Sequence, residues 1–328
     1  MPTDAAIEAV DLRKTYSSRK RTVTALDGLS LTVPTGQVFA LLGPNGAGKS
    51  TTVKILSTLA TADSGSACVG GFDVGRDARR VRQSIGYVSQ GTSADARMTP
   101  RENIIMSARI RGVGAGEART STARLVATLG LDECADQYVK TLSGGQRRRV
   151  DIACALVHAP QVVFLDEPTA GLDPEARAAL WQIIVGMSAD NGLSVIVTTH
   201  YMDEADRLCD HVLLIDHGRA VVGGTPDELK ASIGGTGLTV TVPAAQPDDV
   251  RGAVETVGVV RDLVVETTGD DVRLAVRTDD ATAALAALTG ALDHHGLDYG
   301  AVAVSRPSLD DVYLRYVGHS YNYEGDLT

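Results

Sequence analysis

Residues 43–50 form a loop sequence whose residue types are suited to holding phosphate groups. They read Gly-Pro-Asn-Gly-Ala-Gly-Lys-Ser, which fits the P-loop pattern GxxxxGK[ST]. Glycines let the backbone curl so that successive N–H groups point at phosphate oxygens, and a helix expected from about Lys49 adds the positive end of its dipole. We expect Lys49 to reach the β- and γ-phosphates and the Ser50 hydroxyl to bind Mg²⁺. A P-loop alone also fits a kinase, a GTPase or a helicase.

Two adjacent carboxylates, Asp166 and Glu167, directly follow the apolar run Val162–Leu165. Asp166 is expected to hold Mg²⁺ through water. Glu167 faces the other way and is expected to act as the general base that polarises an attacking water. Solvated surface carboxylates are the alternative, which the preceding buried strand disfavours.

The sequence Ser143-Gly144-Gly145-Gln146 predicts a second anion site at the start of a helix. Ser143 is a good N-cap, and the two glycines expose backbone N–H groups. This site and the P-loop cannot bind one γ-phosphate if both face outward from a single subunit. The arrangement is explained if a second copy of the chain lies opposite.

With these motifs, the sequence resembles the ABC ATPase family over about two thirds of its length. The family's motif order is present: the P-loop, Gln90, Leu142–Gln146, Asp166–Glu167, Gly171–Asp173 and His200. The resemblance implies ATP and Mg²⁺ as ligands and a head-to-tail dimer, with two copies of this chain as the simplest dimer. It also implies an integral-membrane permease as partner, at the cytoplasmic side of the membrane.

Further site residues are implied by the resemblance alone. Gln90 resembles the glutamine that senses Mg²⁺ and the permease, and His200 resembles a γ-phosphate contact; a polar loop residue and a structural histidine are the alternatives. Tyr16 would stack on adenine, or else pack at a sheet edge. The resemblance also implies a set of nucleotide contacts, namely Gly43, Asn45, Gly46, Gly48, Lys49, Ser50 and Thr51 from one subunit and Ser143, Gly144, Gly145, Gln146 and Asp173 from the other.

Short apolar runs alternate with helical patterns, which predicts an α/β domain with a mainly parallel sheet over residues 1–228. The elements of this domain must position the residues named above. The expected strands end in polar residues of chemical interest, as when a site lies beyond the carboxyl ends of parallel strands. They are residues 38–42, 85–89, 162–165, 194–199 and 211–215. A helical insertion is expected at about 94–140, opened by Thr99 as N-cap and Pro100 as first helical residue.

A second, smaller domain is expected at residues 237–317, after a glycine-rich linker at 229–236 and before a loose tail at 318–328. Its pattern of strand, helix, strand, strand, helix, strand predicts a ferredoxin-like α+β fold. The segment Ser308–Leu314 resembles the C-terminal signature of daunorubicin-resistance-type exporter ATPases, which pair with permeases that export drugs or lipid-like products. Its apolar face either packs in the core of this domain or supports the dimer.

Composition narrows the function classes. The 328 residues carry a net charge of −10, which argues against broad nucleic-acid binding. No run approaches the ~18 apolar residues of a membrane helix, and the N-terminus lacks the pattern of a signal peptide. Together with this composition, the resemblance to exporter ATPases leads us to expect an ATPase subunit of an exporter. The alternatives are an importer subunit, a soluble ABC ATPase acting on ribosomes or DNA, and a small-molecule kinase, which would leave Ser143–Gln146 unexplained.

Overall fold

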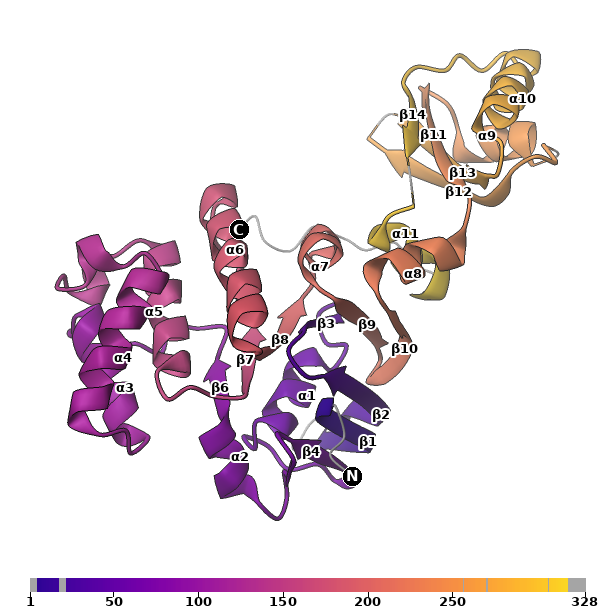
Figure 1. Cartoon of the computed structure of the whole chain (residues 1–328). Helices are drawn as coiled ribbons and strands as arrows, with labels where there is room; N and C mark the ends of the chain where they lie inside the picture. The colour runs from indigo at the N-terminus through magenta and orange to yellow at the C-terminus, as the bar shows by residue number, and fades with distance from the viewer. Residues whose placement is uncertain (1–4, 18–21, 256, 270, 306, 318–328) are drawn as a thin grey trace. The chain divides into compact units, whose positions relative to one another are not determined.

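The computed structural model describes residues 5–17, 22–255, 257–269, 271–305 and 307–317. It divides the chain into two compact units, the first running to Pro226 and the second starting at Asp227 (Figure 1). The expected tail at 318–328 lies outside the described residues.

The main sheet of the first unit has six strands in the order β10-β9-β3-β8-β7-β6. The five strands predicted from the sequence are present and run parallel to their neighbours: β3 (Val38–Leu42), β6 (Ile85–Val88), β7 (Val162–Asp166), β8 (Ser194–Thr199) and β9 (His211–Asp216). Only β10 (Arg219–Gly224) is antiparallel. The carboxyl ends of β3, β6, β7 and β8 therefore meet at one edge of the sheet, where the P-loop, Gln90, Glu167 and His200 follow them.

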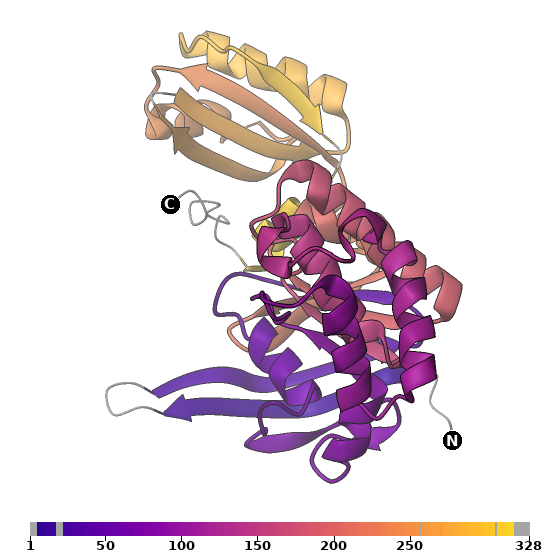
Figure 2. The same ribbon diagram turned by 90° about the vertical axis from the view of Figure 1, so that its left-hand side faces the viewer.

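A second sheet in this unit is antiparallel and was not predicted. Its order is β2-β1-β4-β5, formed by β1 (Ala5–Ser17), β2 (Thr22–Pro34), β4 (Ser64–Val69) and β5 (Phe72–Asp73). Figure 2 shows β1 and β2 as two long neighbouring ribbons. Register shifts interrupt the pairing of β1 with both β2 and β4. These irregularities blur the alternation of apolar and polar residues by which such strands are recognised.

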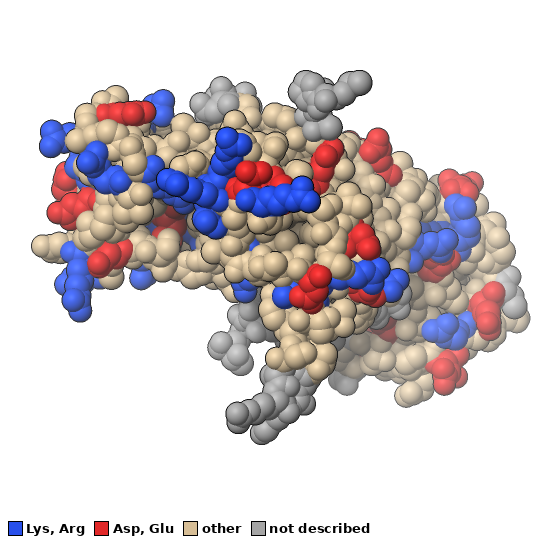
Figure 3. All heavy atoms as spheres, turned by 90° about the horizontal axis from the view of Figure 1, so that it is seen from below, with Lys and Arg blue, Asp and Glu red and all other residues tan. Residues whose placement is uncertain are grey.

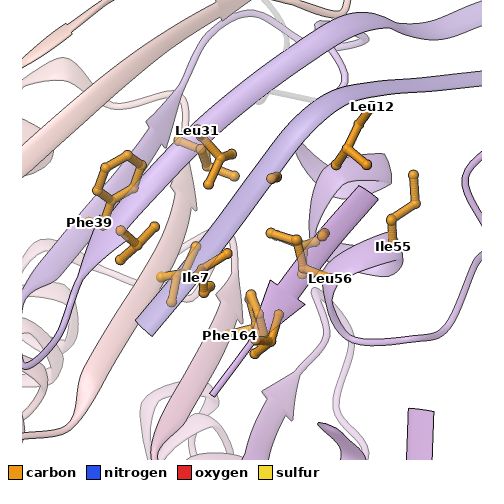
Figure 4. Close-up of a cluster of buried hydrophobic side chains, with 14 of the residues drawn as sticks. Ile7, Leu12, Leu31, Phe39, Ile55, Leu56 and Phe164 are labelled. Atoms are coloured by element: carbon orange, nitrogen blue, oxygen red, sulfur yellow. The ribbon is translucent and has the colours of Figure 1, made fainter. Parts of the chain in front are cut away.

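The core of the first unit joins the two sheets through helix α1 (Lys49–Leu56). Buried apolar side chains from both sheets and from α1 meet in one cluster, labelled in Figure 4 as Ile7, Leu12, Leu31, Phe39, Ile55, Leu56 and Phe164. The helix that starts at the P-loop lysine is thus held on its inner face by Ile55 and Leu56, which are 1% and 0% exposed. This packing fixes the start of α1 relative to the sheet edge.

The remaining helices of the first unit are α2 (Ala78–Ser84), α3 (Pro100–Ile110), α4 (Ala115–Thr128), α5 (Gly144–Leu156), α6 (Pro174–Asn191) and α7 (Met202–Leu208). The stretch 94–140 contains α3 and α4, which lie beside α5 (Figure 1). Thr99 caps α3 in a capping box with Glu102, and Pro100 follows it, as expected. Among the helices in the described ranges, none has the length and apolar character needed to cross a membrane.

The second unit contains a four-stranded antiparallel sheet in the order β12-β13-β11-β14. Its elements are β11 (Thr236–Pro243), α9 (Pro247–Val254), β12 (Arg261–Thr268), β13 (Asp271–Thr278), α10 (Ala281–His294) and β14 (Val302–Ser305). Apolar residues of β11 and β13 pack against α9 and α10 on one face of the sheet. This succession and strand order are those of the predicted ferredoxin-like fold.

The expected linker at 229–236 is largely helical. Helix α8 (Pro226–Ile233) covers its first half and ends before Gly234 and Gly235, both with positive φ. Asp227 and Glu228 lie in the first turn, and Lys230 forms an ion pair of 3.0 Å with Asp227. Proline at the first position and acidic residues in the first turn favour a helix here, and the glycines only mark where that helix ends.

Helix α11 (Leu309–Val317) contains the C-terminal signature. Leu309, Val312 and Tyr313 are at most 2% exposed, whereas Tyr316 is 42% exposed. Asp311 accepts hydrogen bonds from the Ser308 N–H and hydroxyl, and it forms an ion pair of 2.9 Å with Arg277 of β13. Most of the predicted apolar face is therefore buried, but it lies outside the apolar cluster that the sheet forms with α9 and α10.

Candidate nucleotide-binding and hydrolysis site

The P-loop turns sharply between β3 and α1 because two of its glycines leave no room for a side chain. A Cβ at Gly43 would lie 2.1 Å from the carbonyl oxygen of Ile215, and one at Gly48, where φ is 109°, would lie 2.6 Å from that of Ala25. The loop is therefore packed against β9 and β2. This close approach explains the glycine spacing and leaves the backbone N–H groups at the start of α1 to face a ligand.

Lys49 is the first residue of α1, and its side chain folds back over the loop. It is only 4% exposed, and Nζ donates hydrogen bonds to the carbonyl oxygens of Gly43 at 2.6 Å and Pro44 at 3.1 Å. Burial lowers the pKa of Lys49, an effect opposed by the negative charges of Glu167 and Asp166. An ammonium held on neutral carbonyls beside an open site can exchange these contacts for phosphate oxygens.

Asp166 ends β7 and is 5% exposed. Its Oδ1 accepts hydrogen bonds from the Ser50 hydroxyl at 3.1 Å and from the Thr198 hydroxyl at 2.6 Å. A hydroxyl on α1 and a carboxylate on β7 thus lie together at the sheet edge. In proteins, Mg²⁺ is commonly held by one or two protein oxygen ligands together with phosphate oxygens of a bound substrate.

Glu167 leaves β7 in a left-handed conformation with φ of 46°, which is rare for a residue with a side chain. Its N–H is held by Thr198, through the carbonyl oxygen at 3.2 Å and Oγ1 at 2.9 Å. These two bonds hold Glu167 in this conformation at the end of β7. A strained backbone kept by specific bonds is typical of a functional position.

Two of the predicted residues contact the Glu167 carboxylate. Gln90 Nε2 donates to Oε2 at 3.0 Å, and His200 Nδ1 lies 3.6 Å from Oε1. The His200 side chain, together with Lys49 and Gln90, lowers the pKa of Glu167 below its ordinary value although burial acts in the opposite direction. The carboxylate is therefore ionised at neutral pH and able to accept a proton.

These side chains line one cavity of about 700 Å³. Its wall includes six of the predicted site residues, namely Asn45, Ser50, Gln90, Glu167, Asp173 and His200. Lys49 and Asp166 adjoin it through the contacts described above, and Thr51 follows Ser50 on α1. Asp173 caps α6 by accepting from the Ala176 N–H at 2.8 Å, as the sequence Asp173-Pro174 predicts.

Residues Ser143–Gln146, referred to below as the signature, and Tyr16 lie elsewhere. Ser143 caps α5 in a capping box: Gln146 N–H donates to Ser143 Oγ at 3.2 Å, and Ser143 N–H donates to Gln146 Oε1 at 2.9 Å. None of the residues 143–146 lines the cavity. Tyr16 is on β1, is 44% exposed, and has Lys14 Nζ 5.5 Å from its ring centroid. One chain thus brings together the P-loop and the carboxylates, but not the signature.

Two residues that support this site were not predicted. Thr198 holds both Asp166 and Glu167, and Glu204 on α7 is a 3% exposed carboxylate behind the cavity. Glu204 accepts from Thr169 Oγ1 at 2.9 Å and Thr199 Oγ1 at 3.3 Å, and Arg177 Nε lies 3.3 Å from it. It ties together the segment after Glu167, the strand before His200 and helix α6. Thr198 could have been found from its place on the strand that ends at His200.

Glu204 should give the chain a measurable dependence of stability on pH. Burial raises the pKa of Glu204 in the folded chain, so the folded state holds this proton more tightly than the unfolded state. Its contribution to the free energy of unfolding therefore falls as pH rises above the ordinary carboxyl pKa. We expect urea unfolding from pH 4.5 to 7 to show the stability of Glu204→Gln, relative to the wild type, increasing with pH. If the stabilities of the two proteins changed with pH in the same way, Glu204 would not be the group responsible.

Comparisons with known proteins identify the family of both units. The family model described as "ABC transporter" matches residues 26–170, and the model of the C-terminal domain of DrrA1-3-like ATP-binding proteins matches residues 224–317. The daunorubicin/doxorubicin resistance ATP-binding protein DrrA of Streptomyces peucetius is 40% identical over 96% of this chain and 93% of its own length. The linearmycin resistance ATP-binding protein LnrL of Bacillus subtilis is 32% identical over 96% of this chain and 99% of its own.

A solved structure supports the fold of the first unit. The chain of cbiO1 from Clostridium perfringens, part of the ABC transporter complex cbiONQ, matches with a TM-score of 0.64 at 29% identity. The match covers 70% of the present chain and 92% of that chain. Together with the relatives that align along nearly the whole sequence, this shows that the chain belongs to the ATP-binding proteins of ABC transporters and is an ATPase of that family.

Proposed function

We propose that the chain is the ATP-hydrolysing subunit of a membrane exporter and drives efflux of a drug-like or lipid-like substrate through a separate permease. The observation that carries this proposal is that Ser50, Gln90, Glu167 and His200 line the same cavity. Relatives named for drug resistance, and a Nod factor export ATP-binding protein of Sinorhizobium fredii 42% identical over 69% of this chain, favour an exporter over an importer.

The P-loop residues fit the triphosphate of ATP. Gly43, Gly46 and Gly48 allow the loop to present N–H groups, and Lys49 is already placed over it as a buried cation. Asn45, Ser50 and Thr51 complete this side of the ligand. Tyr16 offers an exposed aromatic face for the adenine. The residues present therefore fit the nucleotide that the family binds.

Mg²⁺ would be held by Ser50 and Asp166, with Gln90 nearby. The fit rests on the pairing of Ser50 Oγ with Asp166 Oδ1 at 3.1 Å, a hydroxyl and a carboxylate at the same sheet edge. When bound, the ion neutralises charge that develops on the phosphate oxygens. Asp166 is locked in place by Thr198, so its orientation does not depend on the ligand.

Hydrolysis would use Glu167 as general base. Its lowered pKa keeps the carboxylate ready to take a proton from a water that attacks the γ-phosphorus, and the bond between the γ-phosphorus and the leaving ADP oxygen breaks. His200, which lines the same cavity, would donate a hydrogen bond to the γ-phosphate. Gln90, bonded to Glu167 at 3.0 Å, holds the base in orientation.

A second copy of the chain would complete the site. The N–H groups of Gly144 and Gly145 start a helix capped by Ser143, and these residues lie outside the cavity of their own chain. A head-to-tail dimer brings Ser143–Gln146 of each copy to the nucleotide of the other, and Asp173, which lines the cavity of its own chain, would also contact the other copy across the interface. ATP then favours the closed dimer because its γ-phosphate contacts both copies, and hydrolysis removes this preference.

The second copy and the permease are the proposed partners, and the permease would hold the chain at the cytoplasmic side of the membrane. Nucleic acid is not among the proposed partners. Figure 3 shows acidic side chains lying among the basic ones on the face it presents, and the net charge of the chain is −10. An extended basic surface is what nucleic-acid binding requires.

Co-expression with the membrane protein of a neighbouring gene tests this function. We expect the two proteins to purify together in detergent, and drug accumulation in cells to fall only when both are produced and Glu167 is intact. Co-purification with ribosomes or nucleic acid instead of a membrane protein would contradict the proposal.

A further inference from the structure

Helix α5 contacts the segment that carries Gln90 through a buried arginine. Arg148 is 7% exposed, and its guanidinium donates only to backbone carbonyl oxygens. Nε reaches Pro168 O at 2.9 Å, Nη2 reaches Asp166 O at 2.9 Å, and Nη1 reaches Ser89 O. One side chain on α5 thus holds two places at once. These are the end of β7, directly before Glu167, and Ser89, directly before Gln90.

A second buried side chain of α5 holds the other end of the same segment. Asp151 is 2% exposed, and its Oδ1 accepts three hydrogen bonds of 2.9 Å, from Ser93 N–H, Ser93 Oγ and Ala94 N–H. Hydrogen bonds to a charged, buried acceptor are stronger than neutral ones. The carboxylate therefore anchors the point at which the segment leaves Gln90 for the helical part of the unit.

Between the two anchors lie only Gln90, Gly91 and Thr92, all of which are exposed. A loop of three residues with both ends fixed has little conformational freedom. Gln90 Nε2 makes its 3.0 Å bond to Glu167 from this short span. The position of Gln90 relative to the Glu167 carboxylate is thus set by α5 as well as by the sheet.

We propose that Arg148 and Asp151 are positioning residues that clamp residues 89–94 to α5, so that Gln90 moves as one body with the signature end of that helix. This inference rests on the proposed function, in which Ser143–Gln146 at the start of α5 contacts the nucleotide bound by the other copy. Arg148 also holds the end of β7, whereas Asp151 holds only Ser93 and Ala94. A shift of α5 on that contact would therefore act through Asp151 and change how Gln90 holds Glu167 in its own copy. The clamp would link the two ATP sites of the dimer.

The first test is a double-mutant cycle between Asp151 and Gln90. Asp151→Ala is expected to lower kcat about tenfold or more, with the KM for ATP within about threefold, because misplacement of a catalytic contact acts on turnover. In a Gln90→Ala background, Asp151→Ala should have little further effect, since the residue through which it acts is gone. Equal loss of kcat in both backgrounds would overturn the proposal.

Conservative and control variants separate positioning from general stability. Asp151→Asn keeps an acceptor for the two N–H groups and should restore most of kcat. Arg148→Gln should lower kcat. The matched control is Arg149→Gln, because Arg149 donates to Leu129 O at 3.4 Å and not to residues 89–94. This control should leave kcat unchanged. Equal effects of the two arginine variants would contradict the clamp.

Amide hydrogen exchange tests the clamp without reference to turnover. The amides of Ser93 and Ala94 should exchange faster in Asp151→Ala than in the wild type, while those of the main sheet stay protected. Unchanged exchange would overturn the clamp. Absence of ATP hydrolysis in the wild type would instead overturn the proposed function and leave this local result standing.

Discussion

Replacing Glu167 with glutamine is expected to lower ATP turnover by about 10²–10⁴-fold, while ATP affinity stays within a few-fold of the wild type. The amide has nearly the shape of the carboxylate, and its carbonyl oxygen still accepts the hydrogen bond from Gln90. It cannot accept a proton from water at neutral pH. Phosphate release under saturating MgATP measures the first effect, and equilibrium titration of a fluorescent ATP analogue measures the second.

The matched control for this prediction is Glu175→Gln. Glu175 is an exposed carboxylate in the first turn of α6, eight residues along the chain, and it does not line the cavity. Its turnover should equal that of the wild type. A Glu167→Gln protein that hydrolyses ATP within tenfold of the wild-type rate would show that another group is the base.

Replacing Lys49 with glutamine is expected to weaken ATP binding by about 10–100-fold, since a hydrogen bond to a charged group contributes about 1.5–3 kcal/mol. The ammonium already lies over the loop, on the carbonyl oxygens of Gly43 and Pro44, and needs only a small movement to reach phosphate oxygens. Glutamine is shorter and uncharged. Isothermal titration with MgATP gives the affinity.

Lys54→Gln is the control for the lysine prediction. Lys54 lies on the same helix, one turn further on, and is exposed. Its replacement removes the same charge without touching the loop, so binding should not change. Equal losses in both variants would mean that net charge and not the P-loop contact governs affinity.

The parallel sheet and the polar residues at its edge could be predicted because their signals are local. The strands at 38–42, 162–166 and 194–199 are fully buried, so each contains an uninterrupted apolar stretch, at 38–42, 162–165 and 195–197. The cap at Ser143 and the cap at Asp173 likewise depend on residues within a few positions of one another. Features that depend on such short-range patterns can be predicted from the sequence without knowledge of the fold.

The parts that were missed depend on contacts between distant residues. The antiparallel sheet of β1 and β4 pairs Ile7 with Val69, and nothing near either residue specifies the partner. Thr198 and Asp166 are 32 positions apart in the sequence but meet at 2.6 Å. Arg148 and Asp151 lie on an apparently polar stretch of α5 and are buried only because residues 89–94 and 166–168 fold over them. Sequence periodicity cannot report such contacts.

The central claim, that two copies of this chain enclose ATP between them, is tested most directly by the mass of the Glu167→Gln protein in light scattering. We predict a monomer without nucleotide and a stable dimer with MgATP, because binding persists while hydrolysis, which would reopen the dimer, is blocked. Adding Ser143→Arg to this variant should abolish the dimer and leave ATP binding unchanged. A mass that is the same with and without MgATP would contradict the two-copy arrangement.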